Sequence, residues 1–229
     1  IYKMARYFST NLGLFLLLGD TMKRSIKDPI PEIFQSWEFM NQAVNAHLAG
    51  DGELAHNLFR KAEIRAVWEW LNPGWSRPDL NVLVRRPDGD TQEVPKHLRD
   101  PDRNIAPPIR SAVLQRDGYQ CRYCGIPVVP AEIRKLAHRL YPDAVPWEPY
   151  DVTKQHSGFA CLWLQFDHVV PHSHGGRSSL DNVVVSCALC NFGKDKYTLL
   201  QLNLADPRLT PPTPCTWNGL THFRTVVPA

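Results

Sequence analysis

The chain has 229 residues, a formal net charge of +3, and 43% hydrophobic against 21% charged residues. This composition is close to the globular average and excludes wholesale disorder. The small net charge excludes a strongly basic coat for unspecific nucleic-acid binding, but it leaves room for a local basic groove. Twenty prolines against thirteen glycines predict rigid turns and extended connections between short elements.

The longest apolar run, Leu12–Leu18, is too short to cross a membrane, which takes about 20 residues in a helix. No A-x-A cleavage site follows it, so we interpret it as a buried helix or strand rather than a signal peptide. We therefore expect no membrane partner. Cysteines paired at metal-binding spacing require a reducing compartment, so the sequence favours a cytoplasmic protein.

Residues 29–72 predict two helices. Pro31 stands at a favourable first-turn position, and apolar residues follow at three- and four-residue spacing until Gly50. Asp51 is placed to cap the second helix, which we expect to end at Asn72-Pro73-Gly74. Such a hairpin cannot bury its apolar stripe alone. It packs on the rest of the chain, the interpretation we favour, or it docks a protein partner.

Residues 81–94 predict a β-hairpin, because two strand-like stretches flank the turn sequence Pro87-Asp88-Gly89-Asp90. The segment 95–108 is rich in proline and charge, which is typical of a surface linker. We therefore expect a domain boundary there. The predicted parts are a mainly helical N-terminal region of unassigned role, a second domain, and a C-terminal tail that packs on the second domain: residues 1–105, 106–204 and 205–229.

The second domain mixes helices and strands, so the predicted fold class is α+β. Two helices are expected at 109–116 and 131–140, followed by a strand over 161–170. A loop rich in histidine, glycine and serine then leads to a returning strand at 182–186. Cys187 and Cys190 open a final helix.

Four of the six cysteines form two C-x-x-C pairs, Cys121 with Cys124 and Cys187 with Cys190. Two residues between cysteines allow a tight turn to direct both sulfurs at one ion, and two such turns complete a tetrahedral Cys₄ zinc shell. Two disulfides or a redox pair are the alternatives, which we disfavour because no strand–helix unit places either pair as a redox motif. The other cysteines are interpreted as buried or incidental thiols: Cys161 and Cys215.

Between the two pairs lies a set of residues suited to metal-dependent hydrolysis. Asp167 and His168 are adjacent on a predicted strand, so their side chains leave opposite faces. One can bind an ion while the other addresses a water molecule beyond a phosphate. Asn191 adds a neutral oxygen from the start of the last helix. A carboxylate plus an amide oxygen suits a hard ion such as Mg²⁺.

The order of these short motifs resembles that of HNH endonucleases of the ββα-metal (His-Me finger) type. The motifs are D-H-x-x-P from Asp167, Gly175-Gly176, Asp181-Asn182 and C-x-x-C-N-x-x-K from Cys187, and the similar stretch runs from about Arg116. Two departures stand out. The third letter of the motif is Asn191 instead of histidine, and the stretch before Asp167 is long enough for residues 126–160 to form an insertion.

The resemblance implies a role for each matching residue. His168 would be the general base, with its other ring nitrogen held by a backbone carbonyl. Asp167 and Asn191 would bind the catalytic divalent ion, with Mg²⁺ expected and Mn²⁺ as an alternative. Asn182 would pin the loop and orient His168. In such proteins, cysteine pairs in these positions hold a structural zinc ion.

The expected function is hydrolysis of DNA phosphodiester bonds, on double-stranded DNA, by an endonuclease with this ββα-metal core stapled by zinc. We expect phosphate contacts from the neighbouring cations Arg177, Lys194 and Lys196. Aromatic residues beside the cysteines, such as Tyr123 and Phe192, are expected to shield them in the core. The alternative is a non-catalytic, zinc-stabilised nucleic-acid-binding subunit of a larger defence or restriction assembly.

Overall fold

The structure is a computed structural model that describes residues 22–75, 92–149 and 151–225. The apolar run at 12–18 and most of the expected β-hairpin, residues 81–91, lie outside these residues. The fold is α+β, as predicted, with seven α-helices and one two-stranded antiparallel sheet in the described part of the chain. Within that part, no helix is long and apolar enough to span a membrane.

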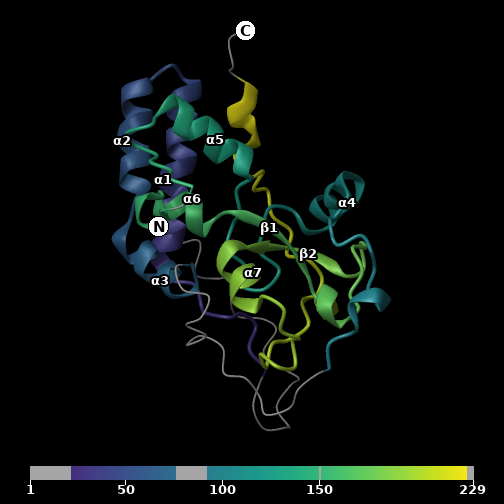
Figure 1. Cartoon of the computed structure of the whole chain (residues 1–229). Coiled ribbons are helices and arrows are strands. Elements are labelled where there is room, and N and C mark those ends of the chain that lie inside the picture. The colour runs from purple at the N-terminus through teal and green to yellow at the C-terminus, as the bar shows by residue number, and fades with distance from the viewer. Residues whose placement is uncertain (1–21, 76–91, 150, 226–229) are drawn as a thin grey trace.

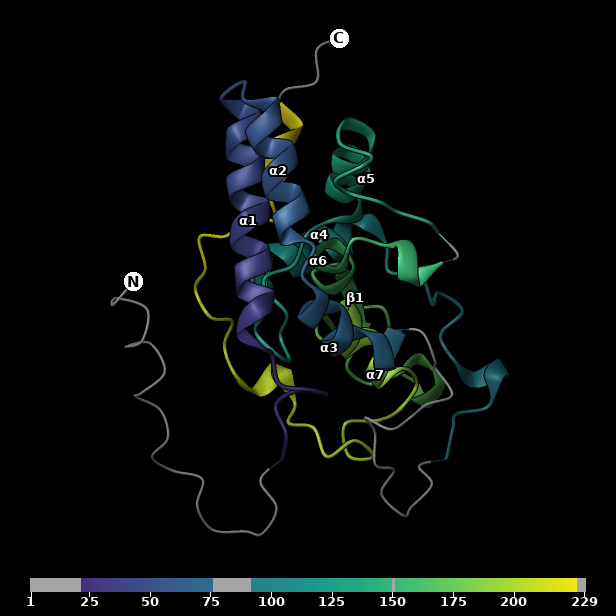
Figure 2. The same cartoon turned by 90° about the vertical axis from the view of Figure 1, so that its left-hand side faces the viewer.

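The N-terminal helices α1 (Pro31–Leu48) and α2 (Gly52–Ala62) lie side by side along one edge of the molecule (Figures 1 and 2). The start of α1 at a proline is confirmed. So is the cap of α2, because the carboxylate of Asp51 accepts a hydrogen bond from the Leu54 amide at 2.9 Å. The apolar stripe of α1, including Ile33, Met40 and Val44, is buried inside the molecule.

The second predicted helix is divided into two helices, α2 and α3 (Arg65–Trp75). The prediction of one continuous helix that ends near Asn72 was therefore wrong. The break at Glu63–Ile64 has a tertiary cause. The Glu63 carboxylate accepts from the Ser157 amide at 2.7 Å, and the amide and carbonyl of Ile64 both contact the Ser157 hydroxyl at 3.2 Å. The chain bends where these contacts replace helical hydrogen bonds.

The remaining α-helices and both strands lie in the chain after residue 106. Helices α4 (Pro107–Asp117) and α5 (Ala131–Leu140) agree with the predictions. The predicted strand over 161–170 was too long, because Cys161 ends a short helix, α6 (Ser157–Cys161), and the strand itself is β1 (Leu164–His168). The unit closes with β2 (Val183–Cys187) and α7 (Ala188–Lys194).

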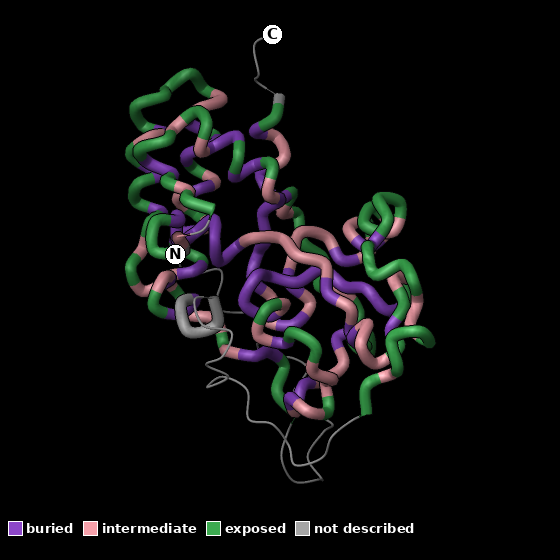
Figure 3. Tube along the Cα trace, in the orientation of Figure 1, coloured by how far each residue is buried: buried purple, intermediate pink, exposed green. Residues whose placement is uncertain are grey.

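β1 and β2 pair so that Asp167 lies opposite Val184 and His168 opposite Val183. Every residue of β2 is buried, in the centre of Figure 3. Helix α7 packs on both strands, and α3 and α6 pack on α7. The last residue of α4 fastens β2 from outside, since the buried Asp117 carboxylate accepts from the Val185 amide at 3.0 Å.

One hydrophobic core joins the N-terminal helices to the sheet, with Met40, Phe59 and Val185 all fully buried in the same cluster. The C-terminal tail contacts both parts. The ring centroids of Trp217 and Trp37 are 5.4 Å apart. The indole N–H of Trp217 donates to the Val128 carbonyl at 3.1 Å. The domain boundaries at 105 and 204 remain predictions.

Candidate functional site

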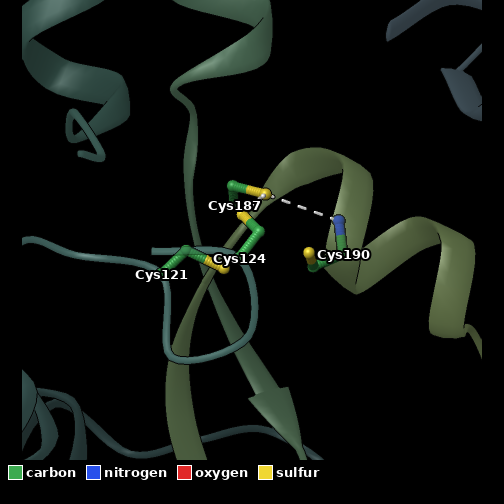
Figure 4. Close-up of side chains that lie close together, drawn as sticks. All are labelled: Cys121, Cys124, Cys187 and Cys190. Atoms are coloured by element: carbon green, nitrogen blue, oxygen red, sulfur yellow. Dashed lines mark hydrogen bonds between the residues drawn. The ribbon is translucent and has the colours of Figure 1, made fainter. Parts of the chain in front are cut away.

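The four cysteines of the C-x-x-C pairs lie together, although they come from two distant segments (Figure 4). Their sulfur atoms are all within 4.8 Å of one another, and the sulfurs of Cys124 and Cys187 are 3.6 Å apart. None of the six cysteines forms a disulfide. Four sulfurs about 2.3 Å from one central ion would be separated by distances of this size. The cluster therefore fits a zinc site.

The backbone shapes each of the two cysteine turns. Gly125 follows the first pair with φ of +77°, a left-handed conformation that glycine adopts without strain, and its amide bonds the Cys121 carbonyl at 2.9 Å. In the second turn the Cys190 amide points at the Cys187 sulfur at 3.5 Å. A backbone bond from Arg122 to Val185, 2.9 Å long, ties the first turn to β2.

The loop between β1 and β2 is held by Asn182. Its amide oxygen accepts from the Val170 amide at 2.9 Å, and its amide nitrogen donates to the carbonyls of Val170 and Arg177 at 3.0 Å each. Gly176 permits this closure, because a Cβ there would lie 1.8 Å from the Val170 carbonyl oxygen. These bonds close the loop directly behind His168, two residues before Val170.

His168 lies at the end of β1, and its Nε2 is 2.9 Å from the hydroxyl of Ser178. The partner of this ring nitrogen is therefore the Ser178 side chain and not the backbone carbonyl that we expected. The Ser178 hydroxyl also lies within hydrogen-bond distance of the carbonyl oxygens of Asp102 and Arg103, at 3.0 and 3.1 Å. Burial, followed by the charge of Lys194, lowers the pKa of His168 from 6.5 to about 4. The imidazole is therefore neutral near pH 7.

Asp167 is only 4% exposed and has two partners that the sequence did not reveal. The Tyr123 hydroxyl donates to one carboxylate oxygen at 2.6 Å, and the Lys194 ammonium donates to the other at 3.2 Å. Burial raises the pKa of the Asp167 carboxyl, while Lys194 and Tyr123 oppose that rise.

The expectation that Lys194 contacts phosphate is corrected. Its side chain is buried, with 1% of its surface exposed, and the ammonium bonds the His168 carbonyl at 2.7 Å in addition to Asp167. It is an internal cation that fastens α7 to the end of β1. Tyr123 is buried as predicted, but Phe192 is 43% exposed and does not shield the cysteines from inside the core.

Asn191 lies on the first turns of α7 and lines the same cavity as Asp167 and His168. Its side-chain nitrogen donates to Gln165 at 3.4 Å, which leaves the amide oxygen as an acceptor. Each carboxylate oxygen has two lone-pair sites, so the bonds from Tyr123 and Lys194 leave Asp167 with acceptor capacity. Mg²⁺ needs only one or two protein ligands beside water and phosphate. The donor set therefore fits such an ion.

The cavity has a volume of about 820 Å³, and much of its other wall comes from residues that precede the predicted domain. Arg99 and Arg103 line it from the predicted surface linker 95–108, and Arg110 lines it from the start of α4; we call these three residues the arginine wall. Most residues of this segment are exposed, as expected of a surface segment, but it is also tied to the β1–β2 loop. The Val94 amide bonds the Ser173 carbonyl at 2.8 Å, and His172 donates to the Asp100 carbonyl at 2.7 Å.

Of the predicted phosphate contacts, Lys196 is exposed and lines the cavity, with its ammonium 3.2 Å from the Glu93 carboxylate. Arg177 is exposed on the loop and is not among the residues that line the cavity. The only hint of the arginine wall in the sequence was the density of arginines in 99–110. Nothing in their spacing placed them at the site.

Comparison with known proteins agrees with this geometry. Residues 160–196 match the family model described as HNH endonuclease, so the chain contains an HNH domain. The match covers β1, the loop, β2 and α7, and it leaves out the first cysteine pair and the arginine wall. No curated protein and no solved structure gives a significant match. An HNH domain indicates a nuclease-type function on nucleic acid.

Proposed function

We propose that this protein is a metal-dependent endonuclease that hydrolyses phosphodiester bonds of double-stranded DNA. One observation carries the proposal: His168, Asp167 and Asn191 line a single cavity together with Arg103, an arginine from outside the HNH segment. A neutral imidazole, a carboxylate and an amide oxygen supply base and ion ligands. The arginine supplies a cation for the phosphate. Such a combination suits metal-assisted hydrolysis of a phosphodiester.

Two metal ions belong to the proposal. The four clustered cysteines would hold a structural zinc ion. Asp167 and Asn191 would hold a divalent ion, for which Mg²⁺ is the expected species. When bound, that ion supplies charge that polarises the phosphate and stabilises the leaving oxygen.

The hydrogen-bond donors and acceptors around His168 indicate which ring nitrogen acts as the base. The Ser178 hydroxyl has one proton and lies next to two carbonyl oxygens that can only accept. It therefore donates to a carbonyl and accepts from Nε2–H of His168. The imidazole then carries its proton on Nε2 and keeps the lone pair on Nδ1. In this state the ring can take a proton from an attacking water molecule through Nδ1.

The remaining residues bind and orient. Asn182 holds the loop that follows His168, so the imidazole keeps its direction during attack. Arg103, Arg110 and Lys196 face the space where phosphate groups would lie. Contacts of this kind position the backbone of nucleic acid without reading its sequence.

The test is a plasmid-nicking assay with Mg²⁺ or Mn²⁺. His168→Ala should lower the cleavage rate about 10²–10⁴-fold, the usual contribution of a general base, while DNA binding persists. His56→Ala, on the distant helix α2, should cleave like the unchanged protein. Full metal-dependent cleavage by His168→Ala would overturn the assignment. A wild-type protein that binds DNA but cleaves none with either ion would support the non-catalytic alternative instead.

A further inference from the structure

Phe192 also lines a second cavity, of about 770 Å³, which the proposed catalytic chemistry does not use. We call it the aromatic pocket, and most of its wall comes from the insertion 126–160. Its principal lining residues are Arg134, His138, Trp147, Gln155, Trp163 and Phe192. Arg134 and His138 stand on α5, one turn apart.

Three aromatic rings of the pocket contact one another in succession. Trp147 and Trp163 meet edge to face with centroids 6.2 Å apart, and Trp163 meets Phe192 in the same way at 6.2 Å. The Arg134 guanidinium lies 3.5 Å from the centroid of the Trp147 ring and 5.2 Å from that of Trp163. A cation stacked on indole is a favourable contact, and Lys135 adds a second basic side chain to the lining of the pocket.

Two polar side chains of the pocket are buried without complete partners. Arg134 is 8% exposed and Gln155 is 6% exposed. Among the described residues, neither Nε of Arg134 nor Oε1 of Gln155 has a hydrogen-bond partner, although Nε2 of Gln155 donates to the Glu148 carbonyl at 2.8 Å. Buried polar atoms without partners cost free energy, so in native proteins they generally meet a ligand or water. Both atoms are covered by protein in this structure, but both side chains line the pocket, so its wall carries a donor and an acceptor without partners next to the rings.

We propose that the aromatic pocket receives one nucleobase, rotated out of its stack, from the DNA strand held in the catalytic cavity. This inference rests on the proposed nuclease function. A base is flat, so it stacks on indole or phenyl rings, and its edge carries acceptors for Arg134 and N–H groups for Gln155. All four bases carry both kinds of group, so the pocket is assigned to a nucleobase as a class.

The two cavities are close enough to share one strand. Trp163 directly precedes β1 and His168 ends it, so they are five residues or about 16 Å apart along the strand. Phe192 is the neighbour of Asn191 in sequence and belongs to both walls. A base in the pocket would therefore lie a few nucleotides from the phosphate at His168.

The test measures binding, with cleavage removed by His168→Ala in the full-length protein. The probes are two short duplexes with a one-nucleotide bulge, identical except that the bulged nucleotide carries a base in one and is abasic in the other. Stacking of a base on aromatic residues contributes about 1–3 kcal/mol, so the duplex with the base should bind about tenfold tighter or more. Equal affinities for the two duplexes would overturn the proposal.

Two variants test whether the preference for the base comes from the aromatic pocket. In Phe192→Ala and in Arg134→Met, each made in the His168→Ala protein, the ratio of the two affinities should fall to about one. Phe34→Ala is the matched control, because Phe34 is 41% exposed on α1 while Phe192 is 43% exposed. It should retain the full ratio. Because a ratio is measured, a general loss of folded protein cancels, and a ratio that survives in both pocket variants would refute the assignment.

The two proposals can fail separately. If the wild-type protein cleaves plasmid DNA and the bulge preference is absent, only the aromatic pocket is refuted. If the protein neither cleaves nor binds DNA, the proposed function is refuted and the pocket assignment falls with it.

Discussion

Asp167 occupies a position where three separate parts of the chain meet. Tyr123, between the first pair of cysteines, donates to it, and so does Lys194 at the end of α7. The same lysine bonds the His168 carbonyl. The residue that the motif marks as a metal ligand is therefore also the link between the cysteine turn, β1 and α7. Because Lys194 bonds both residues, the surroundings of Asp167 also help to determine how His168 is held.

Lys194→Met should test that link through stability. The substitution leaves the buried Asp167 carboxylate without its cation, and breaking a buried pair in this way typically costs about 3–5 kcal/mol. We expect a loss of that size in urea unfolding. Lys196→Met is the matched control, since Lys196 is exposed and its ion pair with Glu93 is solvated, so the free energy of unfolding should hardly change. Adding Asp167→Asn to Lys194→Met should restore part of the loss; no recovery would contradict the explanation.

Two five-residue strands and one seven-residue helix form the candidate catalytic unit. A two-stranded hairpin alone is marginal in water. Here it is supported by α3 and α6, which pack on α7, and by the cysteine cluster, which joins the turn after α4 to the end of β2. A metal at that cluster would connect elements that are far apart in sequence, so its removal should affect this unit first.

Zinc removal should therefore unfold or strongly destabilise the unit. Binding of structural zinc is worth about 10 kcal/mol or more in zinc-finger peptides, which is comparable to the total stability of a domain. We expect Cys187→Ser to lose one bound zinc per chain and to melt at a lower temperature, as measured by elemental analysis and circular dichroism. Cys215→Ser, at an exposed cysteine, should keep the zinc and the melting temperature. Equal zinc content in both variants would contradict a Cys₄ site.

The candidate catalytic cavity is built from more than the HNH segment. Residues 93–110 cross the β1–β2 loop and bring arginines to the cavity, while the N-terminal helices share one core with the sheet. The net charge of +3 is small, but among the described residues Arg99, Arg103 and Arg110 line the cavity from this one segment, where Glu93 pairs with Arg99 and with Lys196. Electrostatic attraction for nucleic acid can therefore be local in a protein of nearly balanced charge.

Arg103→Ala and Arg110→Ala should weaken duplex binding and reduce its dependence on salt. Each lost phosphate contact lowers the slope of log K against log salt by about one. The measurement is a salt titration of binding in the His168→Ala protein. Arg60→Ala, which removes an exposed arginine on α2, is the control and should keep the slope. An unchanged slope in both cavity variants would show that the arginine wall does not contact the phosphates.

Local patterns were sufficient for much of the fold. The starts of α1 and α2, the span of α5 and the last helix at the second cysteine pair follow from proline, capping residues and apolar spacing. These are short-range effects, so the sequence contains them. The break between α2 and α3 could not be predicted from a local pattern, because it depends on Ser157, which is some ninety residues away.

The same division applies to the candidate site. Cys121, Cys124, Cys187 and Cys190, together with the residues of the HNH motif, could be recognised from the sequence alone, because turns and metal shells require particular residue types at particular spacing. The partners of Asp167, the hydroxyl at His168 and the arginine wall were decided only by tertiary structure. Burial of Lys194 and the path of residues 93–110 arise from packing between distant segments, and no local pattern encodes such contacts.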